Sequence, residues 1–195
     1  MRQDVIDASG ELRDGLDASW HALLEACNVR AALLPNHLAS AADMIRRCDP
    51  VAFILTGGGN VTAVSGEHTA RDGVEAMILR LARKHRKPLV GICRGLQVLL
   101  VDDRAKLQPV SGHVRTTHLL EVDGCTRQVN SFHDYGTVTP SLANYEILAR
   151  APDGVVEMIR HHHLPWLGLG WHPERQHPYD PADLAIIAKR IHGPT

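Results

Sequence analysis

The chain has 195 residues and a mass of 21.4 kDa, and 44% of its residues are hydrophobic, which suits one domain with a substantial core. The formal net charge is -1 and the isoelectric point about 6.9, so the composition excludes the strongly basic surface of a nucleic-acid or anionic-membrane binder. No apolar run approaches the ~20 residues of a membrane-spanning helix, and no signal-peptide core opens the chain.

The four cysteines are scattered and form no C-x-x-C pair: Cys27, Cys48, Cys93 and Cys125. This spacing argues against a disulfide framework or a zinc knuckle and favours a reducing compartment. We therefore expect a cytoplasmic protein. The sequence does not indicate an oligomeric state.

Helices and buried strands alternate in the first half of the chain. Val51–Leu55 is a continuous apolar run, as expected for a parallel strand covered on both faces. The expected elements, in chain order, are a helix over 14–27, a strand over 31–34, a helix over 39–47, a strand over 51–55, a helix over 71–85, a strand over 88–92 and a helix that includes 96–100.

The pattern changes after residue 105, where short segments separated by turn residues predict antiparallel ribbons. The expected segments are 115–122, 126–131, 145–150 and 154–160, followed by a last strand over 166–171 and a closing helix over 181–192. The whole pattern predicts an α/β fold: one doubly wound, mostly parallel sheet over residues 1–195, with helices on both faces and added antiparallel strands.

The beginning of the chain is unusual for this fold class. A doubly wound domain normally opens with a buried strand, but Met1–Val5 is polar and is followed by more polar sequence. Either the opening strand is short and poor, or the native start lies upstream of Met1.

A nucleophile is predicted at Cys93, in the segment Gly91-Ile92-Cys93-Arg94-Gly95. This G-x-C-x-G pattern between a buried strand and a helix is typical of a nucleophile elbow, in which glycines permit a sharp turn. Aligned peptide dipoles at a helix N-terminus favour the reactive thiolate. The alternative is a buried structural cysteine, the commoner fate of a lone cysteine.

A base and its orienting partner are predicted in Gly170-Trp171-His172-Pro173-Glu174, at the end of another expected strand. His172 can move a proton for Cys93, and Glu174 can fix the tautomer of His172. An oxyanion hole is expected from the backbone N-H groups of Gly58, in the loop Thr56–Asn60, and of Arg94. All three segments follow strands, where open parallel sheets bind their ligands.

Together these motifs resemble the class I glutamine amidotransferase family over nearly the whole chain. The elbow G-I-C-R-G-x-Q, the T-G-G-G loop and the terminal W-H-P-E stand in the usual order of that family. The segments P-V-S-G-H-V and V-N-S-F-H are similar to its gamma-glutamyl hydrolase branch. The resemblance implies a flavodoxin-like fold, a gamma-glutamyl thioester on Cys93 and release of glutamate, with no metal or organic cofactor.

The resemblance also implies a set of substrate-binding residues. Arg71 is the open case among them, because it is equally interpretable as a structural residue at a helix start. The implied set is Gln97, Gly57, Ser111, Gly112, His113, His133 and Arg71.

The motif combination is most similar to hydrolases of gamma-glutamyl-CDP-amidate, which serve capsule phosphoramidate biosynthesis. Arg94, Arg115 and Arg175 are candidate cations for a phosphorylated leaving group. The alternatives are a glutaminase subunit that supplies ammonia to a separate synthase, a general gamma-glutamyl peptide or polyamine hydrolase, and an inactive binding module.

Relatives often carry a Gly-Gly pair after the elbow helix, where this chain has Asp102–Ala105, which could alter a loop near the pocket. His161, His162 and His163 alternate faces if they lie on a strand, so a solvated strand end is favoured over a metal site, and their role is left open.

Overall fold

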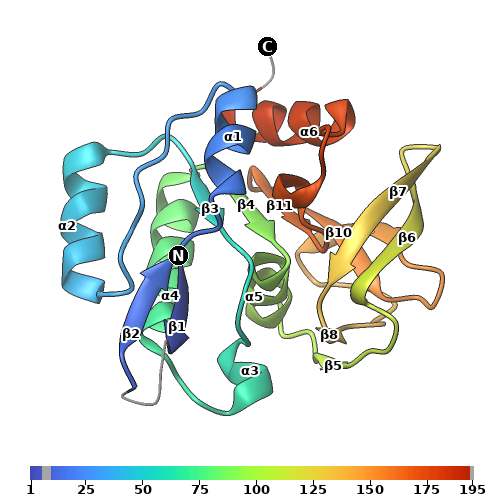
Figure 1. The fold of residues 1–195 in the computed structure, drawn as a ribbon, viewed down its shortest axis with the longest axis horizontal. Coiled ribbons are helices and arrows are strands. Elements are labelled where there is room, and N and C mark those ends of the chain that lie inside the picture. Colours follow the sequence, from blue (N-terminus) through green and yellow to red (C-terminus); the bar gives the residue numbers. More distant parts are fainter. Residues whose placement is uncertain (6–9, 194–195) are drawn as a thin grey trace.

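The computed structural model describes residues 1–5 and 10–193, which form an α/β fold (Figure 1). The strands are β1 (Arg2–Val5), β2 (Leu12–Gly15), β3 (Phe53–Leu55), β4 (Leu89–Ile92), β5 (Gln108–Pro109), β6 (Val114–Val122), β7 (Cys125–Phe132), β8 (Tyr135–Gly136), β9 (Tyr145–Arg150), β10 (Val156–His161) and β11 (Trp166–Leu169). The helices are α1 (Ser19–Ala26), α2 (Leu38–Cys48), α3 (Thr62–Ser65), α4 (Ala70–His85), α5 (Arg94–Asp102), α6 (Pro181–His192) and the 3-10 turn Pro173–Arg175.

The central sheet has five strands in the order β3-β4-β11-β10-β9. β3, β4 and β11 are parallel neighbours, and β10 and β9 continue the sheet in antiparallel fashion. The parallel strands are short apolar runs buried on both faces, which confirms the expected mixed α/β sheet. Their carboxyl ends are in register, with Ile92 opposite Leu169 and Leu55 opposite Gly91.

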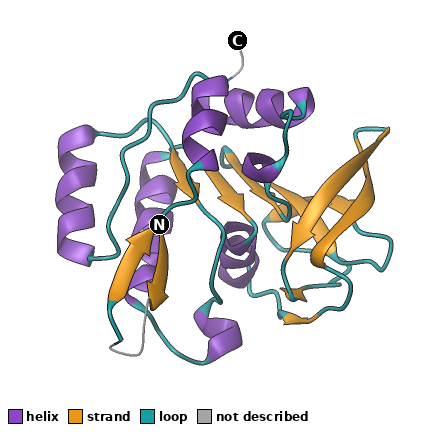
Figure 2. Ribbon diagram, viewed as in Figure 1, coloured by secondary structure: helices purple, strands orange, loops and turns teal. Residues whose placement is uncertain are grey.

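Helices cover both faces of this sheet (Figures 1 and 2). On one face α2, α4 and α5 pack on alternate sheet residues such as Leu89 and Ile159. On the other face α1 and α6 pack on Val90, Ile92 and Leu169. The alternation of side chains along each strand thus divides the interior into two apolar cores, one on each side.

A long antiparallel ribbon, β6 with β7, stands beside the central sheet as a separate pair (Figure 1). Its inner face joins one of the two cores through Leu120, Val122 and Val129. The expected antiparallel segments are therefore present. β9 and β10 join the central sheet, whereas β6 and β7 form a separate two-stranded sheet.

The N-terminal region differs from the sequence prediction. The strand expected over 31–34 is wrong, because these residues form an irregular segment, and the helix expected over 14–27 is confined to Ser19–Ala26. β1 pairs with β2 as a hairpin and contributes nothing to the central sheet. An apolar cavity of about 260 Å³ consequently lies between β3 and residues 29–34, so the segment 31–34 has no neighbouring strand with which to form a ladder.

Within the described residues, 1–5 and 10–193, no helix has both the length and the apolar character that crossing a membrane requires.

Candidate active site

Three segments with chemically useful backbone or side-chain groups meet at one edge of the central sheet. The loop after β3 carries Gly57 and Gly58, the turn after β4 carries Cys93, and the segment after β11 carries His172. Because β3, β4 and β11 are parallel neighbours, these segments emerge side by side at their carboxyl ends, which is where parallel sheets place ligands.

Cys93 occupies a constrained turn between β4 and α5. Its φ angle is 51°, which a non-glycine residue seldom adopts, and its N-H donates to the carbonyl of Leu169 at 2.7 Å. A Cβ on Gly91 would lie 2.5 Å from the carbonyl oxygen of Gly95, and one on Gly95 would lie 2.3 Å from that of Leu55. The two glycines of the motif are therefore required by close backbone contacts.

His172 and Glu174 form a buried pair, with exposed fractions of 2% and 1%. Nδ1 of His172 lies 2.6 Å from Oε1 of Glu174. The backbone of His172 is held by Asn130, whose Oδ1 accepts from the His172 N-H at 2.8 Å and whose Nδ2 donates to the His172 carbonyl at 2.9 Å. Contacts to the ring and to the main chain of His172 therefore orient the imidazole.

The other ring nitrogen of His172 faces Cys93. A Cβ built on Gly57 would lie 3.3 Å from Nε2 of His172 and 3.4 Å from Cβ of Cys93, so both residues border the same glycine. Burial lowers the pKa of His172, but hydrogen bonding to Cys93 and then to Glu174 outweighs burial and raises this pKa to about 9. The protonated imidazole is therefore the favoured form beside the sulfur.

Arg71 organises the loop after β3. The Arg71 guanidinium donates to the carbonyl of Gly58 at 2.7 Å and to that of Gly57 at 3.2 Å, and its Nε donates to Glu75 at 2.8 Å. All these contacts are within the protein, and Arg71 is buried. The geometry supports the structural interpretation of Arg71 over its interpretation as a substrate contact.

The backbone and the side chain of Arg94 have different surroundings. Its backbone N-H belongs to the first residue of α5, where helix N-H groups have no acceptor within the helix. Its guanidinium is buried and pairs with Asp72 and Glu75, each at 2.8 Å. The expectation that this side chain serves as a cation for a phosphorylated leaving group is therefore wrong, whereas the backbone remains a candidate oxyanion donor.

A pocket of about 390 Å³ opens beside Cys93. Gln97 and His133 both line this pocket. Nε2 of Gln97 donates to the Tyr135 carbonyl at 3.0 Å, and Nδ1 of His133 lies 3.1 Å from the same carbonyl. The residues that line this pocket are Arg2, Gly58, Gly59, Asn60, Cys93, Arg94, Gln97, Arg115, Phe132, His133, Asp134, His172 and Arg175.

Five residues of the implied substrate-binding set do not line this pocket: Gly57, Arg71, Ser111, Gly112 and His113. Ser111 and Gly112 are exposed in the turn before β6. His113 is buried and pairs with Asp153 and Glu157 instead. The backbone around Ser111, Gly112 and His113, which we expected along the pocket, is absent from its lining. The pairing of His113 with Asp153 and Glu157 depends on distant residues, which a local motif does not reveal.

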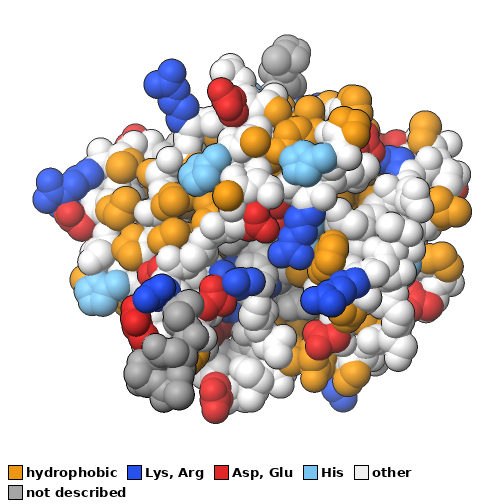
Figure 3. All heavy atoms as spheres, viewed as in Figure 1, with side chains coloured by type: hydrophobic (Ala, Val, Ile, Leu, Met, Phe, Trp, Pro, Cys, Tyr) orange, Lys and Arg blue, Asp and Glu red, His pale blue; other side chains and the backbone are white. Residues whose placement is uncertain are grey.

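The sequence analysis missed Arg2 and Phe132, which line the pocket, and Asn130, which holds the backbone of His172. Asn130 and Phe132 lie in the V-N-S-F-H segment, whose alternation on β7 was the available signal. Arg175 stacks over Phe132, with its guanidinium carbon 4.7 Å from the ring centre, and so borders the pocket mouth. Figure 3 shows several Lys and Arg side chains near the middle of the drawn face, interspersed with acidic and hydrophobic side chains.

Comparison with known proteins bears directly on these features. Over 127 residues the chain is 28% identical to gamma-glutamyl-CDP-amidate hydrolase of Campylobacter jejuni subsp. jejuni, an alignment that covers 64% of this chain and 62% of that protein. Over 149 residues it is 30% identical to a subunit of the glutamine-hydrolyzing GMP synthase of Methanospirillum hungatei, covering 71% and 76%. The chain thus spans less than two thirds of the Campylobacter relative.

The fold has a counterpart among solved structures. A protein of Thermoplasma acidophilum described as a GMP synthase subunit superposes with a TM-score of 0.69 at 16% identity, over 90% of this chain and 86% of that one. At this identity the match speaks for the fold alone. The sequence profile described as "Glutamine amidotransferase class-I" matches residues 13–191. Since that match covers most of the chain, the protein belongs to the class I glutamine amidotransferase family.

Proposed function

We propose that this protein hydrolyses a gamma-glutamyl amide, with Cys93 as nucleophile, His172 as acid and base, and Glu174 as the group that orients His172. The observation that carries the proposal is the single line of contacts from Cys93 through His172 to Glu174, with the last contact at 2.6 Å. Family membership supports the same chemistry.

The reaction follows from these positions. The Cys93 sulfur attacks the gamma-carbonyl carbon, and the carbon-nitrogen bond breaks as protonated His172 gives its proton to the leaving nitrogen. Neutral His172 then takes a proton from water, the resulting hydroxide attacks the thioester, and the carbon-sulfur bond breaks to release glutamate. The raised pKa of His172 supports the first step, because it keeps the imidazole protonated and able to donate.

Backbone groups complete the proposed site. The N-H groups of Gly58 and Arg94 border the pocket and are the proposed donors to the oxyanion that forms on the gamma-carbonyl oxygen. Gly58 has a φ angle of 87°, and its carbonyl accepts a hydrogen bond from the Arg71 guanidinium. Gln97 and His133 are the proposed contacts for the glutamyl end of the substrate, since both border the pocket near Cys93.

For the leaving group we propose a nucleotide phosphoramidate, with gamma-glutamyl-CDP-amidate as the specific substrate and capsule phosphoramidate biosynthesis as its setting. Three guanidinium-bearing residues support an anionic leaving group: Arg2, Arg115 and Arg175 line the pocket around Cys93. Arg115 forms no ion pair with another described residue. The similarity to the Campylobacter hydrolase supports the same choice.

A second candidate is a glutaminase subunit that passes ammonia to a separate synthase. The observation in its favour is the similarity to the GMP synthase subunit of Methanospirillum hungatei, which covers 76% of that protein. The two candidates share the triad and differ in the leaving group and in the need for a partner. A self-standing hydrolase turns over its substrate without a second protein.

The test is glutamate release by the purified protein from three substrates in parallel: gamma-glutamyl-CDP-amidate, L-glutamine and a simple gamma-glutamyl peptide. The proposal expects fast release from the nucleotide and slow release from the other two. Cys93→Ala should abolish turnover, and rapid acid quenching should trap a glutamyl adduct on the unmodified protein but not on the variant. Preference for glutamine or for the peptide would contradict the nucleotide assignment.

Substituting one of the three arginines that line the pocket gives a sharper test of the leaving group. Arg115→Gln should raise KM for the nucleotide substrate roughly 10-fold or more, because a hydrogen bond to a charged group contributes about 1.5–3 kcal/mol. The KM for the peptide should stay unchanged. Arg80→Gln, on the exposed side of α4, removes the same charge away from the pocket and is the matched control. Equal effects of Arg115→Gln on all substrates would contradict a phosphate contact.

A further inference from the structure

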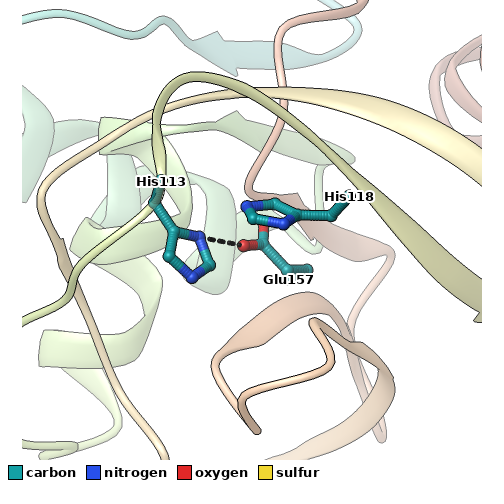
Figure 4. Close-up of side chains that lie close together, drawn as sticks. All are labelled: His113, His118 and Glu157. Carbon is teal, nitrogen blue, oxygen red and sulfur yellow. Dashed lines mark ion pairs between the residues drawn. The ribbon is translucent and has the colours of Figure 1, made fainter.

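A second cluster of polar side chains lies under the ribbon, outside the proposed triad (Figure 4). His113 precedes β6, His118 lies in β6, and Glu157 lies in β10. One ring nitrogen from each histidine and one carboxylate oxygen of Glu157 lie within 4.8 Å of one another. His113 and Glu157 are each 1% exposed, so the cluster is largely shielded from water.

The hydrogen bonds around the cluster determine which ring nitrogens carry protons. Nε2 of His113 lies 2.9 Å from Oδ2 of Asp153, which accepts its N-H. Nδ1 of His133 lies 3.1 Å from the Tyr135 carbonyl, which likewise accepts an N-H. In neutral rings the remaining nitrogens, Nδ1 of His113 and Nε2 of His133, therefore present lone pairs.

Those lone pairs are aimed at a carboxylate. Nδ1 of His113 and Nε2 of His133 each lie 3.1 Å from Oε1 of Glu157. Nε2 of His118 is buried and has no hydrogen-bond partner among the described residues. Several acceptors thus converge. The hydroxyl of Ser131 lies 3.5 Å from Nδ1 of His113 but donates to the His113 carbonyl at the shorter distance of 2.8 Å. A buried acceptor without a partner is costly. A positive charge between them would satisfy all of these atoms, including the one on His118.

The donor set specifies the kind of cation. Two imidazole nitrogens and one carboxylate oxygen are typical ligands of zinc and of neighbouring divalent transition metals. The contact from His113 to Asp153 has the form of the carboxylate–histidine–metal arrangement, in which an outer carboxylate fixes the tautomer of a ligand. We propose that His113, His118 and Glu157 form a divalent transition-metal site of the zinc type, with His133 beside it.

This site joins the ribbon to the central sheet. His113 and His118 belong to the ribbon strand β6 and its preceding turn, whereas Glu157 belongs to β10 in the sheet. The partner strand β7 carries Asn130, which holds the backbone of His172. A bound metal would therefore fix the ribbon against the sheet, a structural function independent of the proposed chemistry at Cys93.

The test measures metal binding directly. Metal-free protein is titrated with Co²⁺, whose visible absorption reports its coordination, and with Zn²⁺ in competition with a chromophoric chelator. The proposal expects one tight ion per chain and a rise in melting temperature on loading. The same titration in Cys93→Ala must give the same stoichiometry, because a metal held by the Cys93 sulfur would be lost in that variant.

Two variants assign the binding to the cluster. His118→Phe should weaken Zn²⁺ binding at least roughly 100-fold, since even outer-shell partners of a metal contribute 10–100-fold. Asp153→Asn changes a side chain that is 49% exposed, so the fold should tolerate it, and it should weaken binding by roughly 10–100-fold. His162→Ala removes an exposed histidine elsewhere and should leave binding unchanged.

The contrary results are equally defined. If no stoichiometric ion binds, or if both cluster variants bind as tightly as His162→Ala, the cluster is an ion-paired network of protonated histidines and the proposal is wrong. Binding that disappears in Cys93→Ala would place the metal at the triad and would also overturn it.

Discussion

The electrostatics of the His172 environment lead to a prediction with a definite sign. Replacing Cys93 by Ala should lower the pKa of His172 from about 9, because hydrogen bonding to Cys93 is the largest of the effects that raise it. The pair with Glu174 at 2.6 Å remains. A hydrogen bond to a charged group contributes about 1.5–3 kcal/mol, which corresponds to roughly 1–2 pKa units.

A double variant isolates the effect of burial. With Cys93→Ala and Glu174→Gln combined, the two groups that form hydrogen bonds to the imidazolium are lost, and burial of the ring becomes the main effect on its pKa. Burial disfavours the charged form, so the pKa of His172 in the double variant should fall below the ordinary value of 6.5. The expected order of pKa values is therefore the unmodified protein, then Cys93→Ala, then the double variant.

The assay is NMR titration of isotopically labelled histidine side chains, with His172 assigned by its loss in His172→Gln. Cys125→Ala, which removes an exposed thiol, is the matched control and should leave the titration of His172 unchanged. A His172 that titrates near 6.5 in the unmodified protein, or that stays above 6.5 in the double variant, would refute the reasoning.

The same variants predict how stability depends on pH. In Cys93→Ala the folded-state pKa of His172 remains above its unfolded value, so the stabilisation is complete below pH 6.5 and is lost as the pH rises through the folded pKa. Relative to the double variant, Cys93→Ala should lose about 1–2 kcal/mol of unfolding free energy over this window. Urea unfolding of both variants at several pH values measures the difference, and parallel curves would contradict it.

Three further substitutions test the scaffold of the site. Gly95→Ala should destabilise the fold by about 1–3 kcal/mol in urea unfolding, since its Cβ would lie 2.3 Å from the Leu55 carbonyl oxygen; unchanged stability would contradict the close contact. Asn130→Ala should lower kcat about 10-fold or more with little change in KM, because the His172 backbone loses its two hydrogen bonds to the Asn130 side chain. A change in KM alone would contradict this positioning function. Arg94→Met should cost about 3–5 kcal/mol in urea unfolding, because it removes the buried cation that pairs with Asp72 and with Oε2 of Glu75, and leaves Glu75 with Arg71 alone. Unchanged stability of the variant would contradict this.

The features predicted correctly from sequence are those encoded locally. The elbow around Cys93 needs glycines at two positions because neighbouring backbone passes within contact distance of each, so the motif itself records the turn. The apolar runs that became β3, β4 and β11 identify buried parallel strands without information from elsewhere in the chain. His172 and Glu174 are two residues apart, so their pairing is also a local property.

The features that were predicted wrongly depend on distant partners. The apolar segment 31–34 has the composition of a buried strand, but strand formation requires a neighbour, and β1 pairs with β2 instead. The side chain of Arg94 carries a positive charge that the sequence could not assign to solvent or to the interior. Asp72 and Glu75 on α4 decide the matter, and their approach to α5 exists only in three dimensions.

The two walls of the pocket therefore differ in kind. One wall is built by the ends of parallel strands and carries Cys93 and His172, the nucleophile and base proposed for all the candidate enzymatic functions. The other wall comes from the hairpin residue Arg2 and the ribbon residues Arg115 and Phe132. These elements lie outside the central sheet and can vary without disturbing its register. Discrimination between a nucleotide and a simple amide as leaving group should therefore follow exchanges in the hairpin and ribbon, while exchanges near Cys93 alter the rate for every substrate alike.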